Sequence, residues 1–157
     1  MLSLVFSAGG ARYALPVDTV REVAPMVVFR EIPGAPEAVR GLMNYRGEIT
    51  PVIDLTSVLS GRPSKRRLST RIVIVDYRGA DGKIHALGLL AERVTDAFSY
   101  EPSAVRPPGI EVEGAPYLTG VIADRQGMIQ LVNPARILPP SLRDALFIER
   151  KDDGHAV

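Results

Sequence analysis

An internal repeat constrains the fold of this chain more than any other feature. Segment 41–59 reads GLMNYRGEITPVIDLTSVL and aligns without a gap with segment 120–138, GVIADRQGMIQLVNPARIL, so that Arg46 falls on Arg125. Repeated units that are too small to bury their apolar side chains alone pack against one another. The sequence therefore predicts two similar halves that face each other, with a cleft between them as a natural place for partners to bind.

The local pattern is that of β-strands. Short runs rich in Val, Ile and Leu are separated by Gly, Pro and Asp. Hairpins are predicted around Gly9–Gly10 and across 79–82, and Pro51 marks an edge or a bulge in its strand. The loop 101–116 contains four prolines and is not expected to form a strand. Extended segments are expected at 2–7, 12–15, 27–31, 47–53, 71–77, 83–90 and 127–132.

Helix is predicted only in short pieces. Asp54 is placed to cap a helix at 55–60, which a glycine then ends. Asn133, followed by proline, is the matching start in the second copy. Ser141 is placed to cap a last helix at 142–148. The predicted fold is therefore all-β, with two small barrels of about five strands each, short helices and a C-terminal helix.

Composition limits the possible environments. The 157-residue chain has no cysteine, which excludes disulfides, zinc–thiolate sites and cysteine nucleophiles and fits a reducing compartment. Its net charge of +1 gives no reason to expect a nucleic-acid or membrane partner. The N-terminus lacks the basic region of a signal peptide, and no apolar run is long enough to span a bilayer. These features predict a cytoplasmic protein.

Catalysis has little support in the sequence. His155 lies in the charged tail 151–157, and His85 lies in a predicted strand. The motifs of serine hydrolases, zinc proteases and P-loop enzymes are absent from the sequence. We therefore expect no catalytic residue, no cofactor and no metal, and an enzyme that uses Asp54 or His85 is the weakest hypothesis.

The basic segment 62–71 leaves an alternative open. Its cations could contact phosphate, so that an SH3-like barrel binds nucleic acid or another protein through this segment. No aromatic residue is interleaved with the charges, which favours a solvated loop instead. The cations are Arg62, Lys65, Arg66, Arg67 and Arg71.

The sharpest local signal is the turn Asn44-Tyr45-Arg46-Gly47. It places a guanidinium and an aromatic ring together between two apolar segments, and both groups are enriched at the energetic centres of interfaces. Arginine also binds carboxylates in a bidentate manner that lysine does not reproduce. The alternative interpretation is a type I or type II turn with an exposed arginine.

The run VRGLMNYRGEITPVIDL, preceded by ALPVDTVREV and followed by ALGLLAERVTDAF and YLTGVIADRQGMIQLVNPARIL, resembles the CheW-like coupling domain of bacterial chemosensory systems. The resemblance extends from about Leu2 to Leu138. It implies two five-stranded SH3-like β-barrel subdomains, in agreement with the repeat. We expect a single domain at 1–140 made of two pseudo-repeated subdomains with interleaved boundaries, followed by a C-terminal helix and frayed tail at 141–157.

The resemblance also implies a function. Such proteins are non-catalytic adaptors that couple the cytoplasmic tip of methyl-accepting chemoreceptors to the regulatory domain of a CheA-type histidine kinase. The protein would be cytoplasmic and recruited to membrane-associated receptor arrays, with no nucleic acid and no direct membrane insertion. The wording LSTRIVIVDY with GLLAERVTD is similar to couplers of alternative, surface-sensing systems.

Site residues follow from the same resemblance, position by position. Arg46 matches the arginine of the N-x-R-G motif, in a receptor-facing groove. An apolar groove between the barrels would take a helical hairpin tip, with Arg46 and Glu22 at its polar rim. The expected partner-binding residues are Val20, Glu22, Asn44, Arg46, Gly47, Ile72, Gly88 and Val94.

Overall fold

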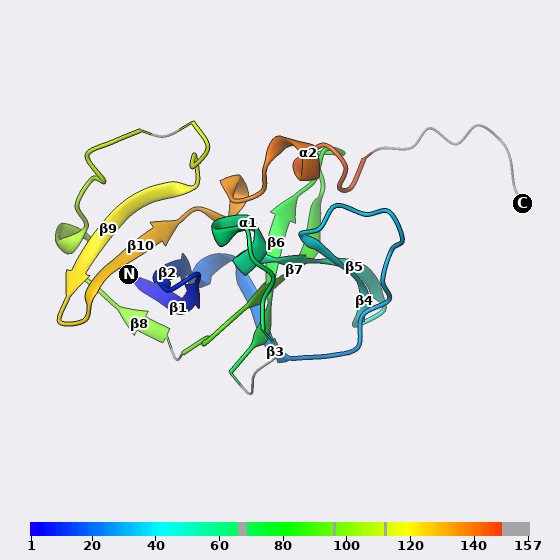
Figure 1. The fold of residues 1–157 in the computed structure, drawn as a ribbon, viewed down its shortest axis with the longest axis horizontal. Coiled ribbons are helices and arrows are strands. Elements are labelled where there is room, and N and C mark those ends of the chain that lie inside the picture. Colours follow the sequence, from blue (N-terminus) through cyan, green and yellow to red (C-terminus); the bar gives the residue numbers. More distant parts are fainter. Residues whose placement is uncertain (66–68, 96, 112, 149–157) are drawn as a thin grey trace, which may run out of the picture.

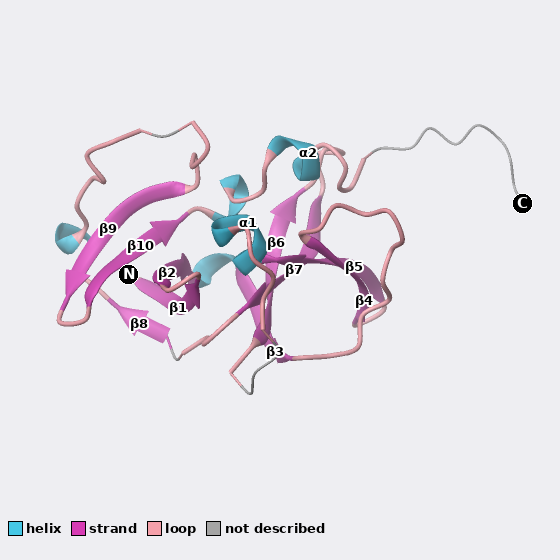
Figure 2. Ribbon diagram, viewed as in Figure 1, coloured by secondary structure: helices cyan, strands magenta, loops and turns pink. Residues whose placement is uncertain are grey.

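The computed structural model describes residues 1–65, 69–95, 97–111 and 113–148, and this part of the chain is mostly β-structure (Figures 1 and 2). The predicted all-β class with short helices is confirmed. The described strands form two five-stranded sheets, which lie side by side in Figure 1. No helix among the described residues is long and apolar enough to cross a lipid bilayer.

Each sheet has the same internal order. The first sheet runs β8-β1-β2-β10-β9 and the second runs β3-β6-β7-β5-β4. The strands of the first sheet are β8 (Ala97–Ser99), β1 (Leu2–Ala8), β2 (Ala11–Pro16), β10 (Gly127–Val132) and β9 (Leu118–Asp124). Those of the second sheet are β3 (Val20–Pro25), β6 (Arg71–Arg78), β7 (Ile84–Ala91), β5 (Glu48–Asp54) and β4 (Val39–Tyr45).

The two repeats exchange strands. The first hairpin, β1–β2, lies in the sheet that holds β8, β9 and β10, whereas the second hairpin, β6–β7, lies with β3, β4 and β5. Each exchange is made by a parallel pairing, β2 with β10 through Ala14 and Leu131, and β7 with β5 through Ile53 and Leu89. Neither sheet is complete without the other half of the chain, so the two halves depend on each other for folding.

The core explains why the exchange is stable. One cluster of buried apolar side chains from both sheets fills the space between them, and it includes Phe6, Leu15, Leu87 and Leu89, each at most 1 % exposed. Burying a side chain of this size contributes about 1.5–3 kcal/mol. Two smaller clusters fill the opposite faces of the sheets. The predicted burial of apolar surface between the halves is confirmed.

The short helices follow the predicted capping chemistry. Helix α1 (Leu55–Ser60) begins after Asp54, whose carboxylate accepts from the Ser57 N–H, and ends at Gly61 in the left-handed region, as predicted. In the second copy, Asn133 caps a single 3-10 turn, η3 (Pro134–Arg136), by accepting from the Ala135 N–H. The matching positions thus serve the same purpose in both repeats.

Two expectations were wrong. The last helix is α2 (Pro140–Arg143), not 142–148, because Pro139 forms its N-cap and Phe147 adopts a positive φ of 53°. The segment 27–31 is not a strand, and only Arg30 makes an isolated bridge, to Leu42 of β4.

Four strands were not predicted, and Pro51 lies in an unexpected place. The missed strands are β3, β4, β8 and β9, and all four form sheet edges. Pro51 lies on β5, which is an interior strand, but the parallel pairing with β7 starts only at Val52, so the proline occupies a stretch that β7 does not yet pair.

Two 3-10 turns and one long loop connect the remaining strands. The 3-10 turns η1 (Val17–Thr19) and η2 (Pro102–Ala104) lead from β2 into β3 and from β8 into the loop before β9. The remainder of the loop at 105–116 is irregular in its described residues, as predicted, apart from a bridge of Arg106 to Val121.

Candidate functional site

The turn that carries Arg46 is tightly specified. Tyr45 and Glu48 form the closing pair of the β4–β5 hairpin, and the two loop residues between them, Arg46 and Gly47, have φ values of 51° and 86°. Positive φ at both positions is typical of a type I′ turn, which matches the twist of a hairpin. The alternative interpretation of a type I or II turn was therefore wrong in turn type. Asn44 fixes the loop, since its Oδ1 accepts from the Gly47 N–H at 2.8 Å.

The second copy builds this turn differently. Among the described non-glycine residues, positive φ occurs at neither Arg125 nor Gln126, whereas Gly127, the first residue of β10, has a φ of 120°. Asp124 accepts from the Gln126 N–H at 2.9 Å. In the second copy the glycine therefore follows the loop instead of lying within it. This explains why Gly127 lies one residue beyond the position that aligns with Gly47.

The Arg46 side chain is held loosely and projects into solvent. It is 74 % exposed, and its Nη2 lies 3.4 Å from Oε2 of Glu22 on β3. Its guanidinium carbon lies 5.5 Å from the centroid of the Tyr45 ring. An exposed ion pair of this kind contributes little to stability. Arg46 is therefore free to exchange Glu22 for a carboxylate on another molecule.

A second group of charges, which the sequence analysis missed, lies beside this pair. Arg21 of β3 forms ion pairs with Asp76 of β6 and, at 3.5 Å, with Glu48 of β5. The bond to Asp76 is the main reason that the pKa of Arg21 is raised. Glu48 also accepts from the Ala86 N–H of β7 at 3.2 Å. The adjacent opposite charges of Arg21 and Glu22 are the sequence signal that could have pointed to this network.

The ring of Tyr45 belongs to the same surface. Removal of water from its hydroxyl is the largest cause that raises its pKa, and a hydrogen bond to Glu22 acts in the same direction. On the opposite face of the β4–β5 hairpin, Ile49 pairs with Asn44 and is 64 % exposed. The exposed end of the second sheet thus combines an aromatic ring with the ion pairs of Arg46 and Arg21.

The other predicted site residues are more buried than Arg46. Ile72 is fully buried on β6, and Gly88 is buried on β7, where a Cβ would lie 3.2 Å from methyl groups of both Ile72 and Val52. Val20 and Val94 are partly buried against the central core. Their role in partner contact stays a prediction, and burial restricts Ile72 and Gly88 to shaping the sheet beneath the surface.

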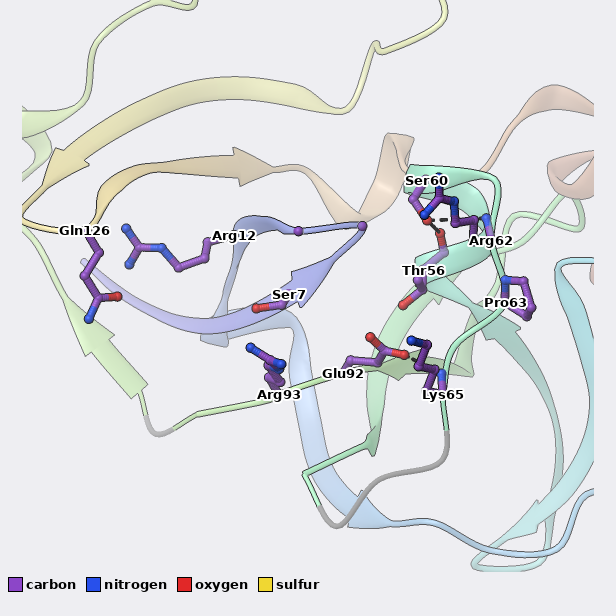
Figure 3. A pocket seen from close by; sticks show the side chains of 12 residues that line it. Ser7, Arg12, Thr56, Ser60, Arg62, Pro63, Lys65, Glu92, Arg93 and Gln126 are labelled. Atoms are coloured by element: carbon purple, nitrogen blue, oxygen red, sulfur yellow. Dashed lines mark hydrogen bonds between the residues drawn. The ribbon is translucent and has the colours of Figure 1, made fainter.

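The predicted apolar groove between the halves stays a prediction, because neither Arg46 nor Glu22 lines a pocket described here. The space between the sheets is filled by the central core. The pocket that opens beside it, of about 460 Å³, is lined mostly by polar and charged groups and by none of the predicted site residues (Figure 3).

The residues of the weaker hypotheses have structural partners. Asp54 is completely buried and accepts from Ser57 and Ser64. His85 stacks on the Phe147 ring at a centroid distance of 4.1 Å, and its Nε2 lies 2.8 Å from Asp81. Within the part of the chain that the structure describes, no three His, Asp or Glu side chains are grouped as metal ligands.

Only part of the basic segment 62–71 lies within the described residues. Arg62 and Lys65 line the pocket at the junction of the sheets. Arg71 Nη1 donates to the Thr70 carbonyl at 3.0 Å, so this cation is engaged by the protein itself. Residues Arg66 and Arg67, and also His155 and the predicted frayed tail, lie outside the described residues.

Comparisons with known proteins agree with this architecture. The CheW-like domain family matches residues 3–140. The chain is 23 % identical over 137 residues to the chemotaxis protein CheW of Bacillus subtilis (86 % of this chain, 85 % of that protein). It is 26 % identical over 144 residues to protein FrzA of Myxococcus xanthus (90 % and 87 %).

A solved structure shows the same fold. The crystal structure of the scaffolding protein TtCheW from Thermoanaerobacter tengcongensis superposes with a TM-score of 0.74 at 27 % sequence identity, over 87 % of this chain and 86 % of that one. The chain belongs to the CheW-like domain family.

Proposed function

We propose that this protein is a non-catalytic adaptor that couples the cytoplasmic tip of a methyl-accepting chemoreceptor to the regulatory domain of a CheA-type histidine kinase. The observation that carries the proposal is the family match over residues 3–140, joined to a structural likeness to a protein described as a scaffold. Relatives over most of the chain are named chemotaxis proteins. An adaptor of this kind needs binding surfaces and no catalytic group or cofactor.

The receptor-facing surface in this proposal is the exposed end of the second sheet. Arg46 is largely exposed there, and its only described ion pair, with Glu22, is weak enough to be replaced on binding. Asn44 and Gly47 hold the turn, so that the backbone at Arg46 is fixed while its side chain projects into solvent. Ile49, on the other face of the same hairpin, supplies exposed apolar area. A helical receptor tip with a carboxylate opposite Arg46 would form the polar contact.

Buried residues contribute to the same surface from beneath. Gly88 leaves room for the methyl groups of Ile72 and Val52, which lie on the strands to either side of β7. A side chain at position 88 would push these strands apart and shift the β4–β5 turn. The predicted roles of Ile72 and Gly88 are therefore those of positioning residues.

The location of the protein follows from its partners. The adaptor would act in the cytoplasm and reach the membrane only through receptor arrays. Individual contacts in such an array need only modest affinity, because each adaptor is held by several neighbours at once.

A pair of matched variants tests the proposal. Arg46→Glu reverses the charge on the β4–β5 turn, and Arg125→Glu makes the same change on the equivalent turn of the other repeat. Calorimetry would measure binding to the receptor tip and, separately, to the kinase regulatory domain. We expect Arg46→Glu to weaken receptor binding at least about tenfold, as loss of an interface arginine does, whereas Arg125→Glu leaves it unchanged.

The controls separate folding from binding. Circular dichroism and thermal unfolding must show that both variants fold as the parent does. Equal receptor affinity for Arg46→Glu and the parent would remove Arg46 from the site. Failure of the folded parent to bind a kinase from the same genome would contradict the adaptor function itself.

A further inference from the structure

The pocket at the junction of the two sheets has features that the adaptor function does not use. It is lined by the turn after β1, the end of α1, the loop 62–65 and the chain that leaves β7 (Figure 3). Four cations and one carboxylate are among the lining side chains, so the wall is positive overall. The lining residues are Ser7, Gly9, Gly10, Arg12, Thr56, Ser60, Arg62, Pro63, Lys65, Glu92, Arg93 and Gln126.

Thr56 supplies an independent sign that a ligand belongs there. The residue is only 4 % exposed, and its hydroxyl oxygen has no hydrogen-bond partner among the described residues. In Figure 3 this hydroxyl is directed from α1 toward the side of the pocket where Glu92 and Lys65 lie. Leaving a buried polar group unsatisfied costs about 1–3 kcal/mol, so such a group calls for an explanation.

The charged groups around Thr56 are available. Arg12 is committed to Asp124, to which it donates two hydrogen bonds. The side chains of Arg62, Lys65 and Arg93, in contrast, form no ion pair with any described carboxylate. Three positive charges that face one cavity with a single carboxylate, Glu92, favour an anion in it.

The pocket wall is also held in place before any ligand binds. The loop that carries Arg62 and Lys65 is fastened to the buried Asp54, which accepts from the Ser64 N–H at 2.7 Å and from the Ser64 hydroxyl at 2.5 Å. The Lys65 N–H donates to the Glu92 carboxylate. This contact also keeps the one carboxylate of the wall engaged with the backbone.

The backbone conformation of Arg93 also supports a binding site here. Arg93 has a φ of 49°, which is uncommon for a residue other than glycine and is typical of functional sites. It follows Glu92, whose carbonyl accepts from the Ser7 N–H of the first sheet at 2.9 Å. The strained residue thus lies where the chain passes from one sheet to the other.

We propose that this pocket binds a phosphate group of a small soluble molecule, with the Thr56 hydroxyl donating to a phosphate oxygen and with Arg62, Lys65 and Arg93 neutralising its charge. Phosphate suits this wall better than a single carboxylate does, because it carries more charge and accepts hydrogen bonds from several directions. The site does not depend on the adaptor function, because it shares no residue with the Arg46 surface.

The test is a titration of the isotope-labelled protein with pyrophosphate, followed by NMR of the backbone amides. Saturable shifts at Thr56, Lys65 and Arg93 are the expected result. A parallel titration with citrate distinguishes phosphate from carboxylate, and tighter binding of citrate at the same residues would overturn the phosphate assignment. Shifts that do not saturate, or that spread evenly over the surface, would mean an adventitious ion only.

Three variants assign the donors. Thr56→Val keeps the shape of the side chain and removes an unsatisfied hydroxyl, so it should fold at least as well as the parent, yet it should weaken pyrophosphate binding about tenfold. Arg93→Asn removes the cation with a residue that tolerates positive φ, and a similar loss is expected. Arg30→Gln, an exposed cation outside the pocket, should bind as the parent does. Unchanged affinity in Thr56→Val and Arg93→Asn would refute the proposal.

Discussion

Replacement of Asp54 by alanine tests whether one buried carboxylate holds the junction of the molecule together. The side chain is completely buried and accepts three hydrogen bonds, from the Ser57 N–H at 3.2 Å and from the N–H and hydroxyl of Ser64 at 2.7 and 2.5 Å. Nη1 of Arg40 lies 3.7 Å away and supplies the nearest positive charge. Alanine would leave these donors without their acceptor in a region closed to water.

The magnitude follows from these contacts. Loss of the helix cap costs about 1 kcal/mol, and each hydrogen bond from Ser64 to the carboxylate contributes about 1.5–3 kcal/mol. Such contributions do not add fully within one network, so we expect a total loss of about 3–5 kcal/mol. With a urea dependence of about 2 kcal/mol per M, the unfolding midpoint would fall by about 2 M.

The repeat supplies the control. Asn133 occupies the same position in the second copy, but its side chain accepts only one described hydrogen bond, from the Ala135 N–H at 3.0 Å. Asn133→Ala should therefore cost about 1 kcal/mol, the value of a cap alone. Urea unfolding followed by circular dichroism would measure both variants. Equal losses for Asp54→Ala and Asn133→Ala would show that the contacts with Ser64 do not contribute to stability.

Two further predictions concern backbone space and pH. A Cβ on Gly41, where φ is 144°, would overlap the Arg30 carbonyl and lie 2.9 Å from its carbon, whereas a Cβ on Gly120 would mainly meet the Val105 side chain. Gly41→Ala should therefore destabilise the protein by about 2 kcal/mol more than Gly120→Ala in chemical unfolding, and equal losses would contradict this explanation. The Lys83 N–H, and then His85, lower the pKa of Asp81. Because a carboxyl group with a lowered pKa stabilises the fold above its unfolded pKa of about 3.9, this contribution should be present at neutral pH and lost as the pH falls through the lowered value. Thermal unfolding between neutral and acid pH should show a smaller acid loss for Asp81→Asn than for the parent, and an identical pH profile would rule the contribution out.

Local structure was predictable wherever a short stretch contains its own chemical reason. Asp54 and Gly61 delimit α1 because a side-chain acceptor and a left-handed residue are needed at its two ends. The hairpin at Gly9–Gly10 forms because both loop residues have positive φ, at 57° and 83°. The N-x-R-G motif likewise indicated the turn that presents Arg46, although not its I′ geometry.

Local sequence patterns did not predict the edge strands or the contacts between residues that are distant in the sequence. Strand β3 exposes every second residue, and β8 has only three residues, so neither carries enough apolar periodicity to be recognised. The pairing of Glu22 with Arg46, and of Arg21 with Asp76, depends on β3 lying beside β6. The pocket with Thr56 brings together four segments that are remote in sequence.

The sequence by itself determined the strand class, the caps, the turns and the existence of two related halves, because each depends on residues close together in the chain. Only the tertiary structure decided that the halves exchange hairpins, through parallel pairings of β2 with β10 and of β7 with β5. Either partner could satisfy the hydrogen bonds of these strands, and the choice is made by the apolar side chains that both sheets bury in one shared core. Burial against the smaller apolar cluster of the second sheet decided that Ile72 and Gly88 lie beneath the surface while Arg46 remains on it.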